Sequence, residues 1–206
     1  MKKIIKSSFV LALLVSVITS CSKEEDFEIA PYKQVIVSAN FEAHLTGSGT
    51  SEVAINLPGW GNYTVVGTRK WHCRNFSNNN YAEFSSFYSA AGTSDEQWLV
   101  LPKMELTKYV NEVLIFKTKT RFANGAVLSV LVSTDFNGTQ AGISTATWTP
   151  LSPTLPTTDD VFVDSGLLDL SSYNSDNVYV AFKYVGSKQG GTTTTFQVDD
   201  IKVYEK

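Results

Sequence analysis

The sequence predicts an all-β fold, a two-sheet antiparallel β-sandwich of the jelly-roll type, and three observations predict it. From about residue 34 onward, short segments rich in Val, Ile, Phe, Tyr and Thr alternate with clusters of Gly, Asn, Ser, Asp and Pro. No window keeps an apolar period of 3.6 residues over the length of a helix. The turn signals follow one another at short spacing, as they do in β-sandwiches and barrels.

The first 20 residues have the three parts of a secretory signal peptide. Three lysines come first, residues 9–18 form an apolar run, and small residues lead to Cys21. The apolar run is shorter than the roughly 20 residues that span a membrane as a helix. Residues 18–21 resemble a bacterial lipobox, so we expect cleavage before Cys21 and lipid attachment to its thiol. Ordinary secretion with an incidental cysteine is the alternative.

Residues 21–33 are expected to form a lipidated tether. Lys23 and the acidic residues 24–26 follow the cysteine at once, and they resemble the surface-export signal of Bacteroidetes lipoproteins. A run of charges cannot join a core, so a solvated tether fits the same residues. We expect a lipid anchor in the outer membrane, with the sandwich of residues 34–206 exposed at the cell surface rather than on the periplasmic side.

Charge and cysteine content exclude several classes of protein. The chain has 17 basic and 20 acidic residues, and loss of the three signal lysines leaves 14 basic residues and a net charge of about −6. This balance argues against a nucleic-acid partner. With Cys21 lipidated, Cys73 stands alone and no intramolecular disulfide can form. Its strand-like setting favours a buried small hydrophobic residue over a reactive thiol. We find no second apolar span, repeat or further domain, and expect a monomer.

The clearest local unit is a predicted hairpin, with strands at residues 113–122 and 126–134 around Asn124-Gly125, the strongest short turn signal. Each strand has one apolar face, as in an antiparallel sandwich. The opposite face of the first strand is apolar at one end and basic at the other. Its residues are Val113, Ile115, Lys117, Lys119 and Arg121.

The remaining strands follow from the same alternation. Residues 101–111 hold one helical turn at most, and the two prolines within 151–156 predict a loop. The strands are expected near residues 34–41, 63–66, 70–76, 81–86, 97–101, 145–149, 160–164, 177–185 and 194–204.

Several short motifs occur in one order along residues 34–206. They are NFE at 40–42, LPGW at 57–60, Trp71, DEQWLVLP at 95–102, LSVLVSTD at 128–135, Asn137-Gly138, TWTPL at 147–151, VYVAFKY at 178–184 and FQVDDIKV at 196–203. The series resembles the choice-of-anchor J and cleaved-adhesin domains of Bacteroidetes surface proteins and, more distantly, the MAM domain. This resemblance implies a galactose-binding-like jelly roll that serves as a binding or adhesion module. The loop from His44 to Leu57 is longer than the usual link of the family.

The last predicted strand changes phase at Asp199-Asp200. The apolar residues before this pair occupy one parity and those after it the other, so either Asp200 is buried or a β-bulge turns it outward. A buried carboxylate is costly unless it is paired. The resemblance supplies a partner in Glu42, whose counterpart in related domains meets the terminal aspartates around calcium. We therefore expect one structural Ca²⁺ bound by Glu42, Asp199 and Asp200. A bulge with solvated aspartates is the alternative.

The ligand surface is less sharply indicated. The segment 75–88, which is rich in Asn and aromatic residues, is the most open candidate. Exposed indoles can bind sugars, but packing in the core or at its rim is the expectation for tryptophans next to strand ends. These tryptophans are Trp60, Trp71, Trp98 and Trp148.

No set of catalytic residues is evident. His44 and His72 lie outside any nucleophile motif, and His72 and Cys73, as neighbours on a strand, point to opposite faces. Zinc-ligand spacing, a phosphate loop and the clustered carboxylates of sandwich glycosidases are missing. We therefore expect no enzyme but a surface binding module that captures a glycan or acts as an adhesin on a surface protein. The alternatives are an assembly lipoprotein that docks to another envelope protein, and an enzyme with a dispersed site.

Overall fold

The computed structural model describes residues 33–47 and 51–206. The predicted signal peptide, the predicted lipid-bearing Cys21 and nearly all of the predicted tether lie outside these residues. The described chain is all-β, with two antiparallel sheets and three short 3₁₀ helices. None of its helices is long and apolar enough to cross a membrane.

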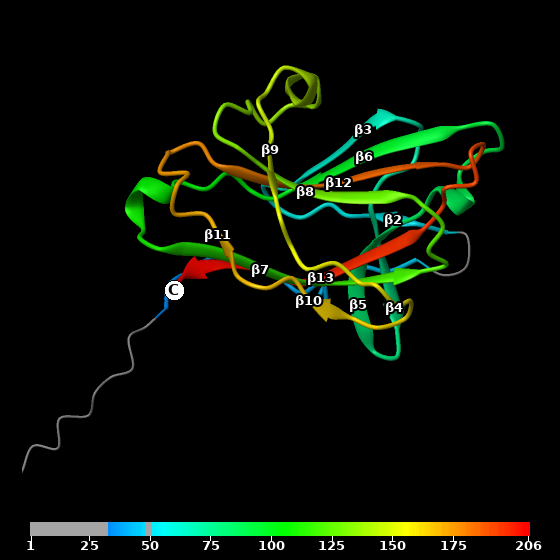
Figure 1. Cartoon of the computed structure of the whole chain (residues 1–206), viewed down its shortest axis with the longest axis horizontal. Coiled ribbons are helices and arrows are strands. Elements are labelled where there is room, and N and C mark those ends of the chain that lie inside the picture. The colour runs from blue at the N-terminus through cyan, green and yellow to red at the C-terminus, as the bar shows by residue number, and fades with distance from the viewer. Residues whose placement is uncertain (1–32, 48–50) are drawn as a thin grey trace, which may run out of the picture. The chain divides into compact units, whose positions relative to one another are not determined.

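The larger sheet has eight strands and is the lower sheet in Figure 1. β13 (Thr195–Glu205) lies at its centre, because β7, β5 and β1 all pair with it. The order across the sheet is β10 (Val163–Asp164), β7 (Glu112–Arg121), β13, β5 (Asn79–Phe84), β4 (His72–Phe76) and β2 (Val53–Ala54), with β1 (Val35–Ala39) on β13 and β11 (Leu168–Asp169) on β7.

The smaller sheet has five strands, and β12 lies between β6 and β8 in it. The 3₁₀ turn η2 (Leu106–Lys108) is the single helical turn expected within residues 101–111. The strand order is β3 (Gly61–Val66), β6 (Ser94–Val100), β12 (Tyr179–Ser187), β8 (Val127–Ser133) and β9 (Thr149–Leu151), and the other 3₁₀ turns are η1 (Ser86–Tyr88) and η3 (Gln140–Ser144).

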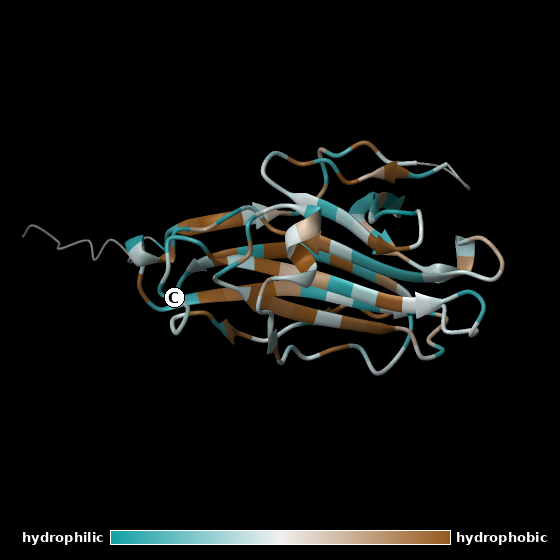
Figure 2. Ribbon diagram, turned by 90° about the horizontal axis from the view of Figure 1, so that it is seen from above, coloured by the Kyte–Doolittle hydropathy of each residue, from teal (hydrophilic) through white to brown (hydrophobic). Residues whose placement is uncertain are grey.

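The core lies between the two sheets, and the alternation of the strands places it there. Figure 2 shows brown and pale segments alternating along the strands, as expected for strands with one apolar face. Each large side chain that leaves water stabilises the fold by about 1.5–3 kcal/mol. The largest fully buried side chains include Trp71, Phe84, Phe116, Phe182 and Tyr184.

The predicted hairpin at Asn124-Gly125 is wrong, because β7 and β8 belong to different sheets. β7 pairs with β13, whereas β8 pairs with β12. The short segment between them crosses the roughly 10 Å that separate packed sheets. Alternation alone cannot distinguish this connection from a hairpin, since both leave each strand with one buried face. The Asn124 side chain accepts from the backbone N–H of Thr193 at 2.6 Å and donates to its hydroxyl at 2.8 Å, which anchors the crossing.

The phase change in β13 is a β-bulge. The register with β7 shifts between Asp199 and Lys202, and Asp200 adopts a φ of 48° in the left-handed region. The bulge turns Asp200 outward, where its side chain is exposed, and returns Ile201 to the core at 0% exposure. Of the two structures that the sequence left open at Asp200, the bulge is therefore the one that forms.

The outer face of the five-stranded sheet is covered by the chain itself. The connection from β8 to β9, which carries η3, lies over it in Figure 1. A second apolar cluster forms beneath, in which Phe136 packs on Trp148 with ring centroids 5.2 Å apart and Trp148 packs on Trp98 at 5.0 Å. The opposite sheet carries a much more polar outer face.

Candidate functional site

The outer face of the eight-stranded sheet is a field of polar and charged side chains. Residues of β7 at even positions point into the core, so the basic end of the face predicted from sequence lies outside. The cross-strand register then sets the neighbours. Across β7, β13, β5 and β4, one row of paired residues consists of Lys119, Gln197, Glu83 and His72. In the neighbouring row, Lys117 lies opposite Asp199, and Tyr81 lies opposite Arg74.

A groove of about 450 Å³ lies on this face. The turn between β4 and β5 builds one wall, because Ser77 and Asn78 both have positive φ, as a two-residue turn of type I′ requires. This turn pairs Phe76 with Asn79 and holds Phe76 in solvent at 65% exposure. The opposite wall is Phe162, just before β10. The groove is lined by Phe76, Ser77, Asn79, Tyr81, Lys117, Lys119, Phe162, Asp164, Asp199 and Asp200.

Lys119, one of the residues that line the groove, lies in an unusual setting. Its side chain is 9% exposed, and its ammonium lies 4.7 Å from the ring centre of Phe162 and 5.6 Å from that of Tyr81. Within the described residues it forms no ion pair, whereas Lys117 and Arg121 on either side of it each pair with an aspartate. Burial, together with the neighbouring charge of Arg121, lowers the pKa of Lys119.

Lys117 closes the groove at one end through its ion pair with Asp200, at 2.9 Å. A second hollow of about 480 Å³ begins beyond this pair and shares Lys117, Asp164 and Asp200 with the groove. An extended ligand could therefore continue along the sheet, past the ion pair. Sites of this size, which combine aromatic walls with a few polar groups, are typical of small-molecule binding.

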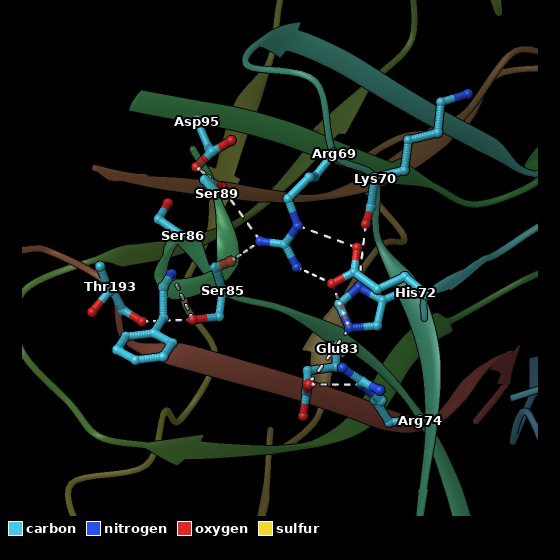
Figure 3. Close-up of polar contacts among 12 residues, drawn as sticks. Arg69, Lys70, His72, Arg74, Glu83, Ser85, Ser86, Ser89, Asp95 and Thr193 are labelled. Carbon is cyan, nitrogen blue, oxygen red and sulfur yellow. Dashed lines mark hydrogen bonds and ion pairs between the residues drawn. The ribbon is translucent and has the colours of Figure 1, made fainter. Parts of the chain in front are cut away.

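A network of alternating charges borders the groove on the β4 side (Figure 3). The Arg69 guanidinium donates to Glu52, to the Ser85 carbonyl and to the Ser89 hydroxyl. The buried His72 follows, with its Nε2 3.7 Å from Glu52 and 3.5 Å from Glu83. This arrangement ties the segment before β2 to β4 and β5.

Glu83 joins this network to the floor of the face. Its carboxylate accepts a hydrogen bond from Gln197 at 2.7 Å and lies 3.5 Å from Arg74 Nε. Burial alone raises the pKa of Glu83, but His72, the hydrogen bond from Gln197 and the charge of Arg74 outweigh it and hold the pKa below its usual range. Glu83 is therefore a buried carboxylate that the fold keeps ionised.

The three predicted calcium ligands lie near the groove but do not surround one point. Asp200 pairs with Lys117, and Asp199 accepts from Asn79 at 2.9 Å and from the backbone of Asp200 at 2.7 Å. Glu42 accepts from the backbone of Asn80 at 3.2 Å. In the part of the chain that the structure describes, no three His, Cys, Asp or Glu side chains are grouped closely enough to hold a metal ion. A calcium ion at these residues would require Asp200 to leave Lys117.

Asp199 is nevertheless buried near other negatively charged side chains. Its side chain is 4% exposed, and burial raises its pKa, with a further rise from the charges of Asp200 and Glu42. The charges of Asp199 and Glu42 in turn act on Cys73. Burial first, and then these charges, raise the pKa of the Cys73 thiol to about 11. Such a thiol is inert at neutral pH, which agrees with the buried hydrophobic residue expected from sequence.

The other residues singled out from sequence divide between core and surface. Trp71 and Trp98 are buried, and Trp60 and Trp148 are half-buried against Phe41 and Phe136. The open segment 75–88 divides as well. Phe76, Asn79 and Tyr81 line the groove, Phe84 lies in the core, and Phe87 and Tyr88 line a separate pocket.

A strand was expected near residues 160–164, but its pairing with β7 and the place of Phe162 in the groove were missed by sequence reasoning. The partner of Val163 in β7 is Thr118, 45 positions earlier in the chain. One signal was available: the basic end of the 113–122 face predicted a charged patch on the outside of a strand. Nothing in the sequence indicated which aromatic ring would lie over it.

Comparison with known families shows to which family the chain belongs. The model of a family described as "Domain of unknown function (DUF5017)" matches residues 74–205, which is more than half of the chain. The chain belongs to this family. The matched part of the DUF5017 domain includes every residue that lines the groove. No curated protein matches the chain.

Solved structures of similar fold place this DUF5017 domain among known sandwiches. The K3 and K1 cleaved adhesin domains of Lys-gingipain from Porphyromonas gingivalis align over 82% of this chain and 99% and 98% of theirs, with TM-scores of 0.52 and 0.50 at 16% and 14% identity. The CBM22-1 xylan-binding domain of Xyn10C from Paenibacillus barcinonensis aligns over 83% of this chain and 94% of its own, with a TM-score of 0.45 at 14% identity. The expected likeness in fold to cleaved-adhesin domains is confirmed. The resemblances to choice-of-anchor J and MAM domains stay predictions.

Proposed function

We propose that this chain is a non-catalytic, cell-surface binding module that captures a glycan in the groove on the eight-stranded sheet. The observation that carries the proposal is the groove itself, in which the exposed ring of Phe76 and the half-buried ring of Phe162 face polar side chains that the sheet holds in place. Aromatic faces pack on sugar rings, and fixed amides and charges bind hydroxyl groups.

The position of the groove supports the same proposal. The outer face of the other sheet is covered by its own apolar cluster, while this face combines half-buried rings with polar groups such as Asn79 and Lys117. In this proposal the domain is a monomer held outside the cell by a lipid on Cys21, where extracellular glycans and surface proteins are the available ligands. An adhesin role is the narrower form of this proposal.

The proposal is tested with the mature chain on a glycan array, followed by isothermal titration calorimetry on the strongest ligand. Replacing Phe76 by Ala is expected to weaken binding about tenfold, because contact-surface aromatics are each worth 1 kcal/mol or more. The fold should be unaffected, since the ring is 65% exposed. Phe87→Ala is the matched control, because Phe87 is an exposed ring outside the groove. If no glycan binds, the proposal fails.

A second candidate function, docking to another envelope protein, is favoured by a separate cluster of exposed rings. Phe87, Tyr88 and Phe122 are 54%, 52% and 70% exposed and border one pocket of about 310 Å³. Cations lie over these rings, with Lys188 4.0 Å from the centre of Phe87 and Arg121 5.2 Å from that of Phe122. Such a surface suits an apolar protein segment that carries acidic side chains. Under this function, Phe122→Ala reduces cell-envelope association and Phe76→Ala does not.

Calcium binding by Glu42, Asp199 and Asp200 is a further part of the proposal. The negative charge gathered around the buried Asp199 is what a hard cation would relieve. Calcium is expected to raise the unfolding temperature of the mature chain, and a chelator to reverse the rise, since a ligand of the native state stabilises it by mass action. Asp199→Asn should abolish the response, while Asp169→Asn, an exposed aspartate elsewhere, should not. Identical unfolding with calcium and with chelator would exclude the site.

A further inference from the structure

We propose that the ligand of the groove is anionic: Lys119 receives a carboxylate or sulfate group of an acidic glycan. This inference rests on the proposed glycan-binding function and names the class of ligand for the same groove. It starts from one side chain, an ammonium in the wall of a ligand-sized hollow that is nine-tenths buried and has no anionic partner within the described residues.

Of the three basic residues on the outer face of β7, Lys119 is the one that forms no ion pair within the described residues. On the same face of β7, Lys117 pairs with Asp200 at 2.9 Å and Arg121 with Asp160 at 2.7 Å. Both neighbours are much more exposed than Lys119, so water could have solvated their charges without an ion pair. Of these three side chains, the most buried one is therefore the one without a counter-charge in the described part of the chain. Buried charges are normally paired, because an unpaired charge is costly to remove from water.

The carboxylates whose charges act on Lys119 are already engaged. Asp160 pairs with Arg121, and Glu83, in the same cross-strand row, is held by Gln197 and by Arg74. Among the groove's own carboxylates, Asp199 accepts hydrogen bonds on both of its oxygens and Asp200 pairs with Lys117. Within the described residues, Asp164 is the remaining acidic side chain of the groove, and it is exposed at the rim beside Lys117. An anionic group would consequently lie on the Lys119 side of the groove, away from Asp164.

The rings around Lys119 hold its charge in place without neutralising it. The ammonium lies over Phe162 and Tyr81, at 4.7 and 5.6 Å from the ring centres, and attraction to ring faces orients a cation. A ring carries no net charge, so the cation keeps its full attraction for an anion in the groove. The lowered pKa of Lys119 comes from burial and from Arg121, and a bound anion would oppose both effects.

The experiment measures binding of the mature chain to three purified oligosaccharides of matched length by isothermal titration calorimetry. The probes are an oligogalacturonate, which carries carboxylates, a sulfated galactan oligosaccharide without carboxylates, and a neutral cello-oligosaccharide. We expect at least one acidic probe to bind about tenfold or more tightly than the neutral one, and Lys119→Met to remove that preference. Lys119→Arg keeps the charge and should keep the preference.

Lys183→Met is the matched control. Lys183 also lies over an aromatic ring, 5.1 Å from the centre of Trp98, but it is on the five-stranded sheet and pairs with Glu96. Its loss should leave all three affinities unchanged. A salt titration of the unaltered chain gives a readout that needs no variant: added NaCl should weaken binding of the acidic probe and leave the neutral one unchanged.

The outcomes separate this inference from the function on which it rests. Equal binding of neutral and acidic probes, with Lys119→Met and salt both without effect, overturns the inference and leaves the glycan-binding function standing. Binding of none of the probes, and of nothing on the glycan array, overturns both. A preference for only one acidic probe supports the inference and decides between carboxylate and sulfate.

Discussion

Trp71→Ala is expected to destabilise the domain by about 3–5 kcal/mol, the usual cost of deleting a large buried aromatic side chain. The indole is 0% exposed, lies 6.0 Å from the ring centre of Phe84, and donates from Nε1 to the Gln97 carbonyl at 3.4 Å. Small domains have a total stability of roughly 5–15 kcal/mol, so this single change could remove much of it. Urea unfolding followed by far-UV circular dichroism measures the loss.

Two further variants make the Trp71 result interpretable. Trp71→Phe keeps most of the ring volume and should cost less than half as much. Trp60→Phe changes a tryptophan at the edge of the core and should cost less again. A loss of under about 1 kcal/mol for Trp71→Ala would mean that the indole does not fill the interior, since such a small cost is typical of exposed positions. The sugar-platform alternative for this tryptophan would then need to be reconsidered.

Glu83→Gln is the second change with a large expected effect. It removes one partner of a buried pair, since the side chains of Arg74 and Glu83 are 13% and 10% exposed, and leaves the guanidinium without a counter-charge. Such losses cost about 3–5 kcal/mol. Adding Arg74→Met should recover part of the loss, because a buried pair replaced as a whole is often nearly neutral. Glu105→Gln, an exposed partner of Lys108, is the control and should have no measurable effect.

The effect of Glu83→Gln should depend on pH in a defined direction. The folded state lowers the pKa of Glu83, so this carboxylate contributes its full stability above the ordinary Glu pKa of about 4.3 and loses it as the pH falls through the lowered value. The difference in unfolding free energy between the unaltered chain and Glu83→Gln should therefore be constant near neutrality and shrink in acid. A difference that grows on acidification would contradict the assignment.

The sequence predicted the strands well where each strand has one buried face. The alternating residues of 113–122 and 177–185 correspond to β7 and β12, because burial of one face imposes a period of two. The two-residue strands β2 and β11 were not predicted, since they are too short to show any period. The pairing partners of the strands could not be predicted either, because alternation shows which face of β8 is buried but not which strand lies beside it.

The candidate site could be predicted only in part for the same reason. The basic face of residues 113–121 and the Asn-rich turn after Phe76 were visible in the sequence, and both form the groove. The partner of Lys117 was not, because Asp200 is 83 positions away and reaches it through a bulge that was one of two alternatives. Lys119 lacks an ion pair in the described structure because the neighbouring carboxylates bind other groups. A local sequence pattern cannot predict those distant contacts.

The central position of β13 affects when the protein can fold relative to its synthesis. β1, β5 and β7 all hydrogen-bond to residues 195–205, so the strands made earlier lack their partner until this segment has left the ribosome. The larger layer must then assemble after synthesis rather than alongside it, through contacts between distant parts of the chain, which form slowly. A polypeptide exported in an unfolded state would gain from this delay, because the larger sheet cannot form while its central strand is still being synthesised.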